Sequence, residues 1–176
     1  MEFISDIHRD RHREALGGDI LRLGVFERSV PEIAGKEPRE IAKMRIRGMD
    51  STAIAELKAS VILHKLFFDS FIRETSCPSV AVRTQFGSEA RLISLMYDLG
   101  MSTPRGFLAL TRKGKSLAPA ASESALGILN MGEPILAVDL AEHAYYGDFC
   151  FDKASYLRSA LSYLRLSVAD IALEKG

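Results

Sequence analysis

The sequence lacks the long apolar segments, the cysteine pairs and the excess charge that mark several common classes of protein. No run of about 18 apolar residues occurs, so a transmembrane helix is not expected. Two isolated cysteines, Cys77 and Cys150, make neither a disulfide framework nor a Cys-x-x-Cys site, and we expect both to be reduced packing residues. The chain also has no tryptophan.

The sequence shows no excess of positive charge that would attract nucleic acid or an anionic membrane. Lys plus Arg equal Asp plus Glu at 23 each. The arginines within residues 9–13 are balanced by Asp6, Asp10 and Glu14, a pattern that favours the solvated face of a helix over a nucleic-acid patch. Charge from the second residue onward and the absence of an apolar signal core predict a cytoplasmic protein.

The first half of the chain reads as helices. The apolar spacing predicts a helix over residues 4–23, with a possible kink at Gly17-Gly18. Asp50 or Ser51 can cap a second helix, which is expected to continue past His64 before a break at 76–78. Residues 79–100 then predict one or two helices interrupted at Gly87. On the helices predicted along the chain, the apolar residues expected to point into the core include Ile20, Leu95 and Ile171.

The pattern changes after residue 100. Strands are expected at 106–111, 116–121 and 134–139, followed by one long helix over 154–173. The resulting fold class is α+β, in which an N-terminal helical hairpin is followed by a small three-stranded antiparallel sheet flanked by helices. The length of 176 residues suits one compact unit or two parts that share a core, which we place at 1–78 and 79–176.

One apparent motif fails. Gly114-Lys115-Ser116 is similar to the end of a phosphate-binding loop, but the position of the required earlier glycine is Ala109. These residues are better explained as a hairpin turn.

A carboxylate and an imidazole follow the clearest strand. Asp139 and His143 stand four residues apart, so both can reach one metal ion from the end of the strand and the turn beyond it. An ionised carboxylate beside an apolar strand must be paired or bind metal, although a loop cap is the simpler alternative. Mixed imidazole and carboxylate ligands suit iron, manganese or zinc.

The remaining histidines admit two interpretations. His64 lies in an apolar stripe, where burial favours a neutral ring that needs a partner, either a hydrogen bond in the core or a metal. His8 and His12 are one helical turn apart and therefore share a face. That face can be an exposed basic helix start or an inward surface.

Several segments resemble signatures of the iron/manganese superoxide dismutase family. Residues 139–146, Asp-Leu-Ala-Glu-His-Ala-Tyr-Tyr, are similar to its C-terminal Asp-x-Trp-x-His-Ala-Tyr-Tyr motif. Residues 63–68 resemble its helical Asn-His-Thr-Phe-Tyr-Trp segment, and residues 8–12 resemble its first-helix His-His-x-x-His-His block. Residues 86–88 (Phe-Gly-Ser) and 106–107 (Gly-Phe) fall near two further landmarks, in the order of the family.

The resemblance implies a superoxide dismutase-like metalloenzyme that converts superoxide to oxygen and hydrogen peroxide. It implies one iron or manganese ion per subunit, held by His8, His64, Asp139 and His143. It also implies a homodimer, in which Glu142 reaches a ligand histidine across a two-fold axis and Tyr145 contacts His12.

The surroundings of the expected ligands depart from the family pattern. The gateway tyrosine, eight residues after the first histidine, is Leu16, and the tryptophan between aspartate and histidine is Ala141. The glutamine that contacts metal-bound solvent is missing, because Gln85 does not align and Ser60 and the Ser124 region occupy its usual locations. The sequence therefore leaves two alternatives to a dismutase: other redox or oxygen chemistry at the same metal, and a non-enzymatic metal-binding protein.

Overall fold

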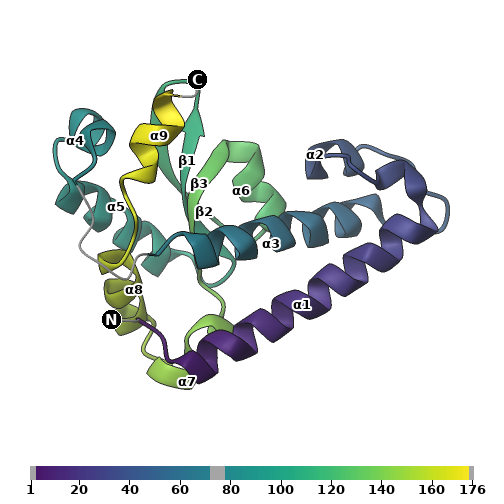
Figure 1. The fold of residues 1–176 in the computed structure, drawn as a ribbon, viewed down its shortest axis with the longest axis horizontal. Helices are drawn as coiled ribbons and strands as arrows, with labels where there is room; N and C mark the ends of the chain where they lie inside the picture. The colour runs from purple at the N-terminus through teal and green to yellow at the C-terminus, as the bar shows by residue number, and fades with distance from the viewer. Residues whose placement is uncertain (1–2, 72–77, 175–176) are drawn as a thin grey trace.

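The computed structural model describes residues 3–71 and 78–174 (Figure 1). Two long helices precede a three-stranded sheet, and shorter helices pack on both faces of the sheet. The described helices are α1 (Asp6–Ser29), α2 (Pro38–Ile41), α3 (Ser51–Asp69), α4 (Val80–Phe86), α5 (Glu89–Ser102), α6 (Ala125–Met131), α7 (Tyr146–Phe149), α8 (Lys153–Ser162) and α9 (Val168–Glu174), with 3-10 turns η1 (Pro31–Ile33) and η2 (Glu142–Ala144). This arrangement confirms the predicted α+β fold class. The division into parts 1–78 and 79–176 stays a prediction.

Side-chain caps set the starts of the two long helices. The Ser5 hydroxyl accepts a hydrogen bond from the backbone N–H of His8 at the start of α1. Asp50 caps α3 as predicted, with its carboxylate 2.9 Å from the backbone nitrogen of Thr52. Helix α1 continues unbroken through Gly17-Gly18, where the sequence suggested a kink. The two helices form the expected hairpin (Figure 1).

The sheet has the strand order β2-β1-β3, and both pairings are antiparallel. Its strands are β1 (Phe107–Lys113), β2 (Ser116–Ser122) and β3 (Glu133–Asp139), which confirms the three predicted strands. A tight turn at Gly114 joins β1 to β2, where φ is +59°. Asp139 ends β3 opposite Phe107, which places its carboxylate at one edge of the sheet beside the helical hairpin.

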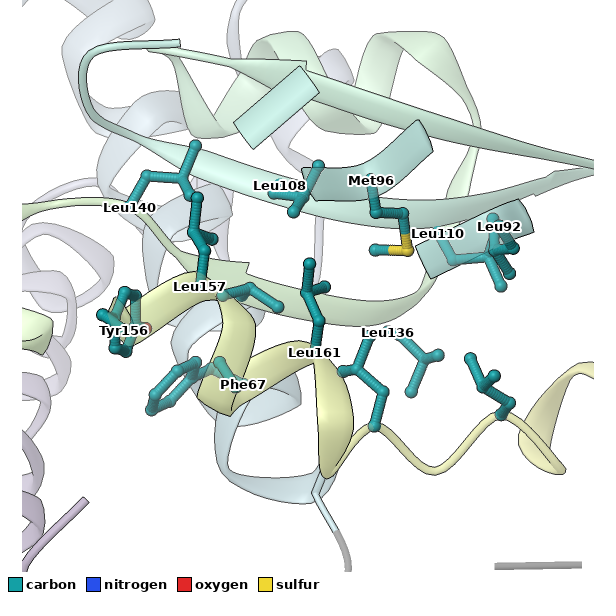
Figure 2. Close-up of a cluster of buried hydrophobic side chains, with 14 of the residues drawn as sticks. Phe67, Leu92, Met96, Leu108, Leu110, Leu136, Leu140, Tyr156, Leu157 and Leu161 are labelled. Atoms are coloured by element: carbon teal, nitrogen blue, oxygen red, sulfur yellow. The ribbon is translucent and has the colours of Figure 1, made fainter. Parts of the chain in front are cut away.

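Side chains alternate between two buried clusters along the central strand. Leu108 and Leu110 point into the cluster that α5 and α8 complete, and Figure 2 shows this cluster. Phe107 and Ala109 face the opposite cluster, which α3 and α6 complete. Each fully buried leucine contributes roughly 1.5–3 kcal/mol to folding. Because α3 packs against the sheet, the hairpin and the C-terminal part share this second cluster.

The single C-terminal helix predicted over 154–173 is wrong. The chain forms α8 and α9 instead, with a connection between them that pairs back on the end of α3. Leu164 makes an isolated β-bridge with Phe71, and the backbone nitrogen of Arg165 donates to the carbonyl of Ser70 at 2.9 Å. These long-range bonds, together with the burial of Leu164 and Leu166, stabilise an extended turn over a continuous helix.

Several smaller expectations also fail or fall outside the described residues. Ile20, Leu95 and Ile171, predicted to face inward, are exposed. Cys150 is exposed rather than packed in the core. Cys77 and the first part of the predicted break at 76–78 lie outside the described residues. Among the described helices, none has both the length and the apolar character needed to cross a bilayer.

Candidate metal centre

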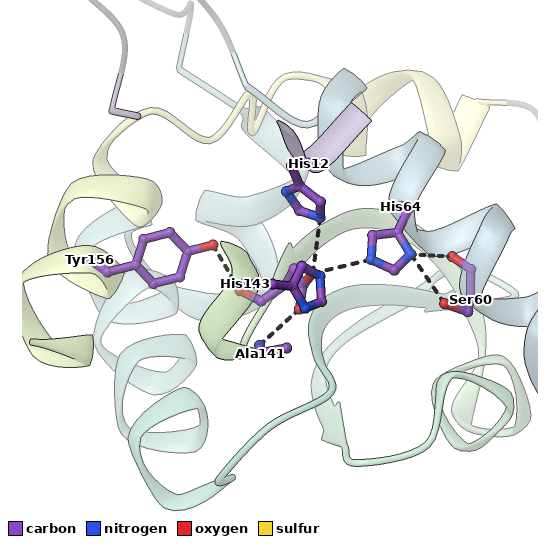
Figure 3. A network of polar contacts seen from close by, with 7 residues as sticks. His12, Ser60, His64, Ala141, His143 and Tyr156 are labelled. Atoms are coloured by element: carbon purple, nitrogen blue, oxygen red, sulfur yellow. Dashed lines mark hydrogen bonds and ion pairs between the residues drawn. The ribbon is translucent and has the colours of Figure 1, made fainter. Parts of the chain in front are cut away.

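Three histidines and one aspartate from four different elements meet at the junction of the helical hairpin and the sheet (Figure 3). One candidate ligand atom from each side chain lies within 4.8 Å of all the others. The four residues are His12 on α1, His64 on α3, Asp139 at the end of β3 and His143 in η2. His12 and His64 are far in sequence from each other and from Asp139 and His143, so only the folded chain can assemble the whole group.

The geometry centres on one oxygen of the aspartate. The Nε2 atoms of His12 and His64 each lie 3.2 Å from Oδ2 of Asp139, and Nε2 of His143 lies 2.8 Å from it. Asp139 is almost fully buried, and so is His12. The side chain of His143 is half exposed, which leaves one side of the cluster open to solvent.

Local packing orients the two helical histidines. The His12 ring lies 4.9 Å from the ring of Phe67 and 5.2 Å from that of Phe68, measured between centroids. Ser60, one turn earlier on α3, contacts the opposite edge of the His64 ring. Nδ1 of His64 lies 2.9 Å from the carbonyl oxygen of Ser60 and 3.1 Å from its hydroxyl. Each ring therefore presents its Nε2 edge to the centre of the group.

Asp139 is fixed at both its side chain and its backbone. Its Oδ1 accepts a hydrogen bond from the backbone nitrogen of Ala141 at 2.8 Å. Its carbonyl oxygen accepts a hydrogen bond from the hydroxyl of Tyr156 on α8, also at 2.8 Å. These bonds use Oδ1 and the backbone, so Oδ2 alone faces the three imidazoles.

The hydrogen bond between His64 and Ser60 leaves Nε2 of His64 directed at the centre of the cluster. A carbonyl oxygen can only accept, so Nδ1 of His64 carries the proton that binds Ser60. Nε2 of the same ring faces Oδ2 of Asp139 at 3.2 Å. Nε2 of His12 is buried at a similar distance from the carboxylate without hydrogen-bond geometry. Imidazole nitrogen and carboxylate oxygen are donor atoms that iron, manganese or zinc would bind.

Burial of one negative charge among imidazoles governs the electrostatics. Burial by itself raises the pKa of the Asp139 carboxyl, but its contacts with His12, His143 and His64 hold that pKa well below the usual value. The hydrogen bond to Asp139 raises the pKa of His143. Burial lowers the pKa of His12, and its contact with Asp139 only partly offsets this effect. An ionised Asp139 and a neutral His12 are the forms that bind metal.

The structure differs from the predicted ligand set at one position on α1. His8, assigned as the first ligand, lies outside the group, and His12 joins His64, Asp139 and His143 instead. The His8 ring packs against Gly147 of α7, so closely that a Cβ at that glycine would overlap with Nδ1.

The start of helix α1 explains this exchange. The backbone nitrogen of Ser5 donates to the carboxylate of Asp148 at 2.6 Å, which holds the first turn of α1 beside α7. His8 therefore meets α7, and His12, one turn of about 5.4 Å further on, reaches the end of β3. The two histidines share one face, so their spacing alone could not distinguish them.

The expected neighbours of the ligands lie close by. Tyr145 is buried and stacks on Tyr156 with 4.9 Å between ring centroids. Glu142 is exposed next to the half-exposed His143. Their role at a dimer interface stays a prediction.

A cavity of about 200 Å³ opens beside the cluster. The residues that line it are Ala15, Leu16, Asp19, His64 and His143. Leu16 was singled out from the sequence, but Asp19 and the buried Tyr156 were missed as residues around the site. Asp19 could have been found by helical spacing, because it stands seven residues after His12 and therefore on the same face of α1.

Two comparisons with known proteins bear on this site. Residues 78–170 match the family described as iron/manganese superoxide dismutases, C-terminal domain. The chain is also similar to the superoxide dismutase (Fe) of Cupriavidus metallidurans, with 28% identity over 151 residues, which cover 80% of this chain and 73% of that protein. The family match includes Asp139 and His143, and it begins after the helices that carry His12 and His64.

Proposed function

This chain belongs to the iron/manganese superoxide dismutase family, and we propose that it binds one iron or manganese ion and converts superoxide to oxygen and hydrogen peroxide. The proposed ligands are His12, His64, Asp139 and His143. One observation carries this proposal: three Nε2 atoms converge on a single buried carboxylate oxygen, while Nδ1 of His64 is tied to a carbonyl.

When bound, iron or manganese supplies a one-electron couple that can accept an electron from one superoxide and return it to another. The reaction consumes two superoxide ions and two protons and yields one oxygen and one hydrogen peroxide. The buried charge of Asp139 would balance part of the charge of the cation, and the hydrogen bond that Nδ1 of His64 donates to the carbonyl of Ser60 fixes the tautomer of His64. The hydroxyl of Tyr156 holds the end of β3, so the carboxylate keeps its place.

We further propose that dismutation is slow. Leu16 and Ala15 form an apolar wall of the access cavity and cannot donate protons to the product. Ala141 offers only a backbone N–H to the aspartate. Loss of one residue that contacts a metal ligand or its solvent commonly costs roughly 10–100-fold in affinity or activity. A turnover rate near the diffusional limit would contradict this expectation.

A second candidate function follows from the size of the cavity. Liquid water occupies about 30 Å³ per molecule, so a cavity of about 200 Å³ accepts more than a diatomic substrate. This space favours redox or oxygen chemistry on a larger molecule as the alternative. Retained metal without consumption of superoxide would make this alternative the better one.

A homodimer is the proposed assembly. Glu142 is exposed and is the chain neighbour of the half-exposed His143, so a second copy could contact both beside the cavity. Light scattering at micromolar concentration should give twice the mass of one chain. A monomer at that concentration would refute the proposed assembly.

Metal analysis combined with an assay of superoxide consumption tests the proposed activity. The purified protein should hold close to one iron or manganese ion per chain. Asp139→Ala should abolish metal retention, whereas Asp98→Ala, which removes an exposed carboxylate on α5, should leave it unchanged. Equal metal content in Asp139→Ala and the unaltered protein would overturn the assigned site.

A further inference from the structure

The access cavity contains one acidic side chain and no permanently cationic one among the described residues that line it. The lining consists of two apolar residues, two imidazoles of the proposed metal site and the carboxylate of Asp19. A molecule that reaches the cluster through this cavity passes that carboxylate. The charge of the wall therefore bears directly on which molecules enter.

Asp19 is the more buried partner of an ion pair on α1. Its carboxylate pairs with Arg22, one turn further along α1. The side chain of Asp19 is only 20% exposed, whereas that of Arg22 is 68% exposed. The guanidinium thus lies in solvent, where its field is screened strongly, and the carboxylate lies at the cavity, where screening is weaker.

The field of Asp19 reaches the proposed ligands. Asp19 lines the same cavity as His64 and His143, so its negative charge acts on the space in front of both rings. His143 is the ligand whose side chain is half exposed, and it lines the same cavity. An anion that approaches this open side meets the same negative potential, and repulsion lowers its local concentration.

We propose that Asp19 determines the charge preference of the access cavity, disfavouring small anions relative to uncharged molecules of similar size. The inference rests on the proposed metal at the inner end of the cavity. It deepens that proposal, because superoxide is itself an anion. Asp19 limits its access and leaves neutral molecules unaffected.

The test measures binding of a small anion to the iron-loaded protein. Azide is titrated into the ferric protein and its dissociation constant is read from visible absorption, so no turnover is needed. Asp19→Asn keeps the size of the side chain, removes its charge and should tighten azide binding by about three- to tenfold. Arg22→Gln leaves the carboxylate uncompensated and should weaken azide binding.

Two controls separate a local effect from a general one. Asp10→Asn removes the same charge from an i,i+3 pair with Arg13 on the same helix, but Asp10 is exposed and does not line the cavity. This variant should bind azide like the unaltered protein. Nitric oxide, an uncharged probe of the ferrous protein, should bind equally to all the variants. Higher ionic strength should reduce the difference between Asp19→Asn and the unaltered protein.

The outcomes are distinguishable. Equal azide affinity in Asp19→Asn and the unaltered protein, with iron retained in both, would overturn the role of Asp19 alone. Equal tightening by Asp10→Asn would do the same, because the effect would then be one of net charge. Failure of the unaltered protein to retain iron would overturn the metal site, and this inference with it.

Discussion

The hydroxyl of Tyr156 donates a hydrogen bond to the backbone carbonyl of Asp139, with 2.8 Å between the oxygens. Both residues are buried, and the bond joins α8 to the end of β3 at the proposed metal site. Burial raises the pKa of Tyr156 well above its usual value, so the phenol keeps the proton that it donates. The position of the carboxylate thus depends on a helix that supplies no candidate ligand.

The substitution Tyr156→Phe should destabilise the protein. It removes one hydroxyl and leaves the buried carbonyl of Asp139 without that donor, at a cost of about 1–3 kcal/mol. Tyr146→Phe removes a hydroxyl from a half-exposed ring and should change stability by less than about 0.5 kcal/mol. Urea unfolding of both variants measures the difference. Equal midpoints would show that the bond contributes nothing.

Of the two α1 histidines, only His12 should be needed for metal retention. His12→Ala removes a proposed ligand and should cost most of the bound iron or manganese. His8→Ala removes a ring outside the group and should leave the metal content near that of the unaltered protein. Metal analysis after dialysis decides between them. Loss of metal in His8→Ala alone would restore the assignment made from the sequence.

The contrast between these histidines shows how far the sequence could define the site. The apolar stripe around His64 and the strand end at Asp139 and His143 admitted a metal site, and the family resemblance chose these three residues as ligands. On α1 the stripe admitted two rings one turn apart, and the choice depended on the contact of Ser5 with Asp148. That contact joins residues 143 positions apart, so no local pattern could predict it.

The fold shows the same division between local and long-range causes. The three strands and the Asp50 cap follow from alternation and capping, which are local. The connection between α8 and α9 depends instead on bonds from Leu164 and Arg165 to the end of α3. Likewise, α6 is capped by Ser124 and also by Glu56 on α3, whose carboxylate accepts from the backbone nitrogen of Ala125 at 2.5 Å.

Two glycine substitutions should change stability in opposite directions. At Gly17 a Cβ would meet no atom within 4 Å, and the residue lies inside a long helix, so Gly17→Ala should stabilise by about 0.5–1 kcal/mol. At Gly147 a Cβ would overlap with the His8 ring, so Gly147→Ala should destabilise the packing of α1 on α7. Thermal unfolding measures both. Stabilisation by Gly147→Ala would contradict the close contact.

The last prediction concerns pH and the start of α8, the helix that carries Tyr156. Asp152 caps α8, with its carboxylate 2.9 Å from the backbone nitrogen of Ser155. This bond to the backbone lowers the pKa of Asp152 below 3.8. The charged form therefore stabilises the folded state above that value, and this contribution is lost as the pH falls through the lowered pKa.

Asp152→Asn retains a capping side chain but removes the charge. The variant should be less stable than the unaltered protein at pH 6, and the difference should shrink as the pH falls through the lowered pKa of Asp152. Urea midpoints measured for both proteins across this range test the sign, because other titrating groups affect the two proteins equally. A difference that grows on acidification would mean that the carboxylate is not stabilised in its ionised form, and the cap would then act through its geometry alone.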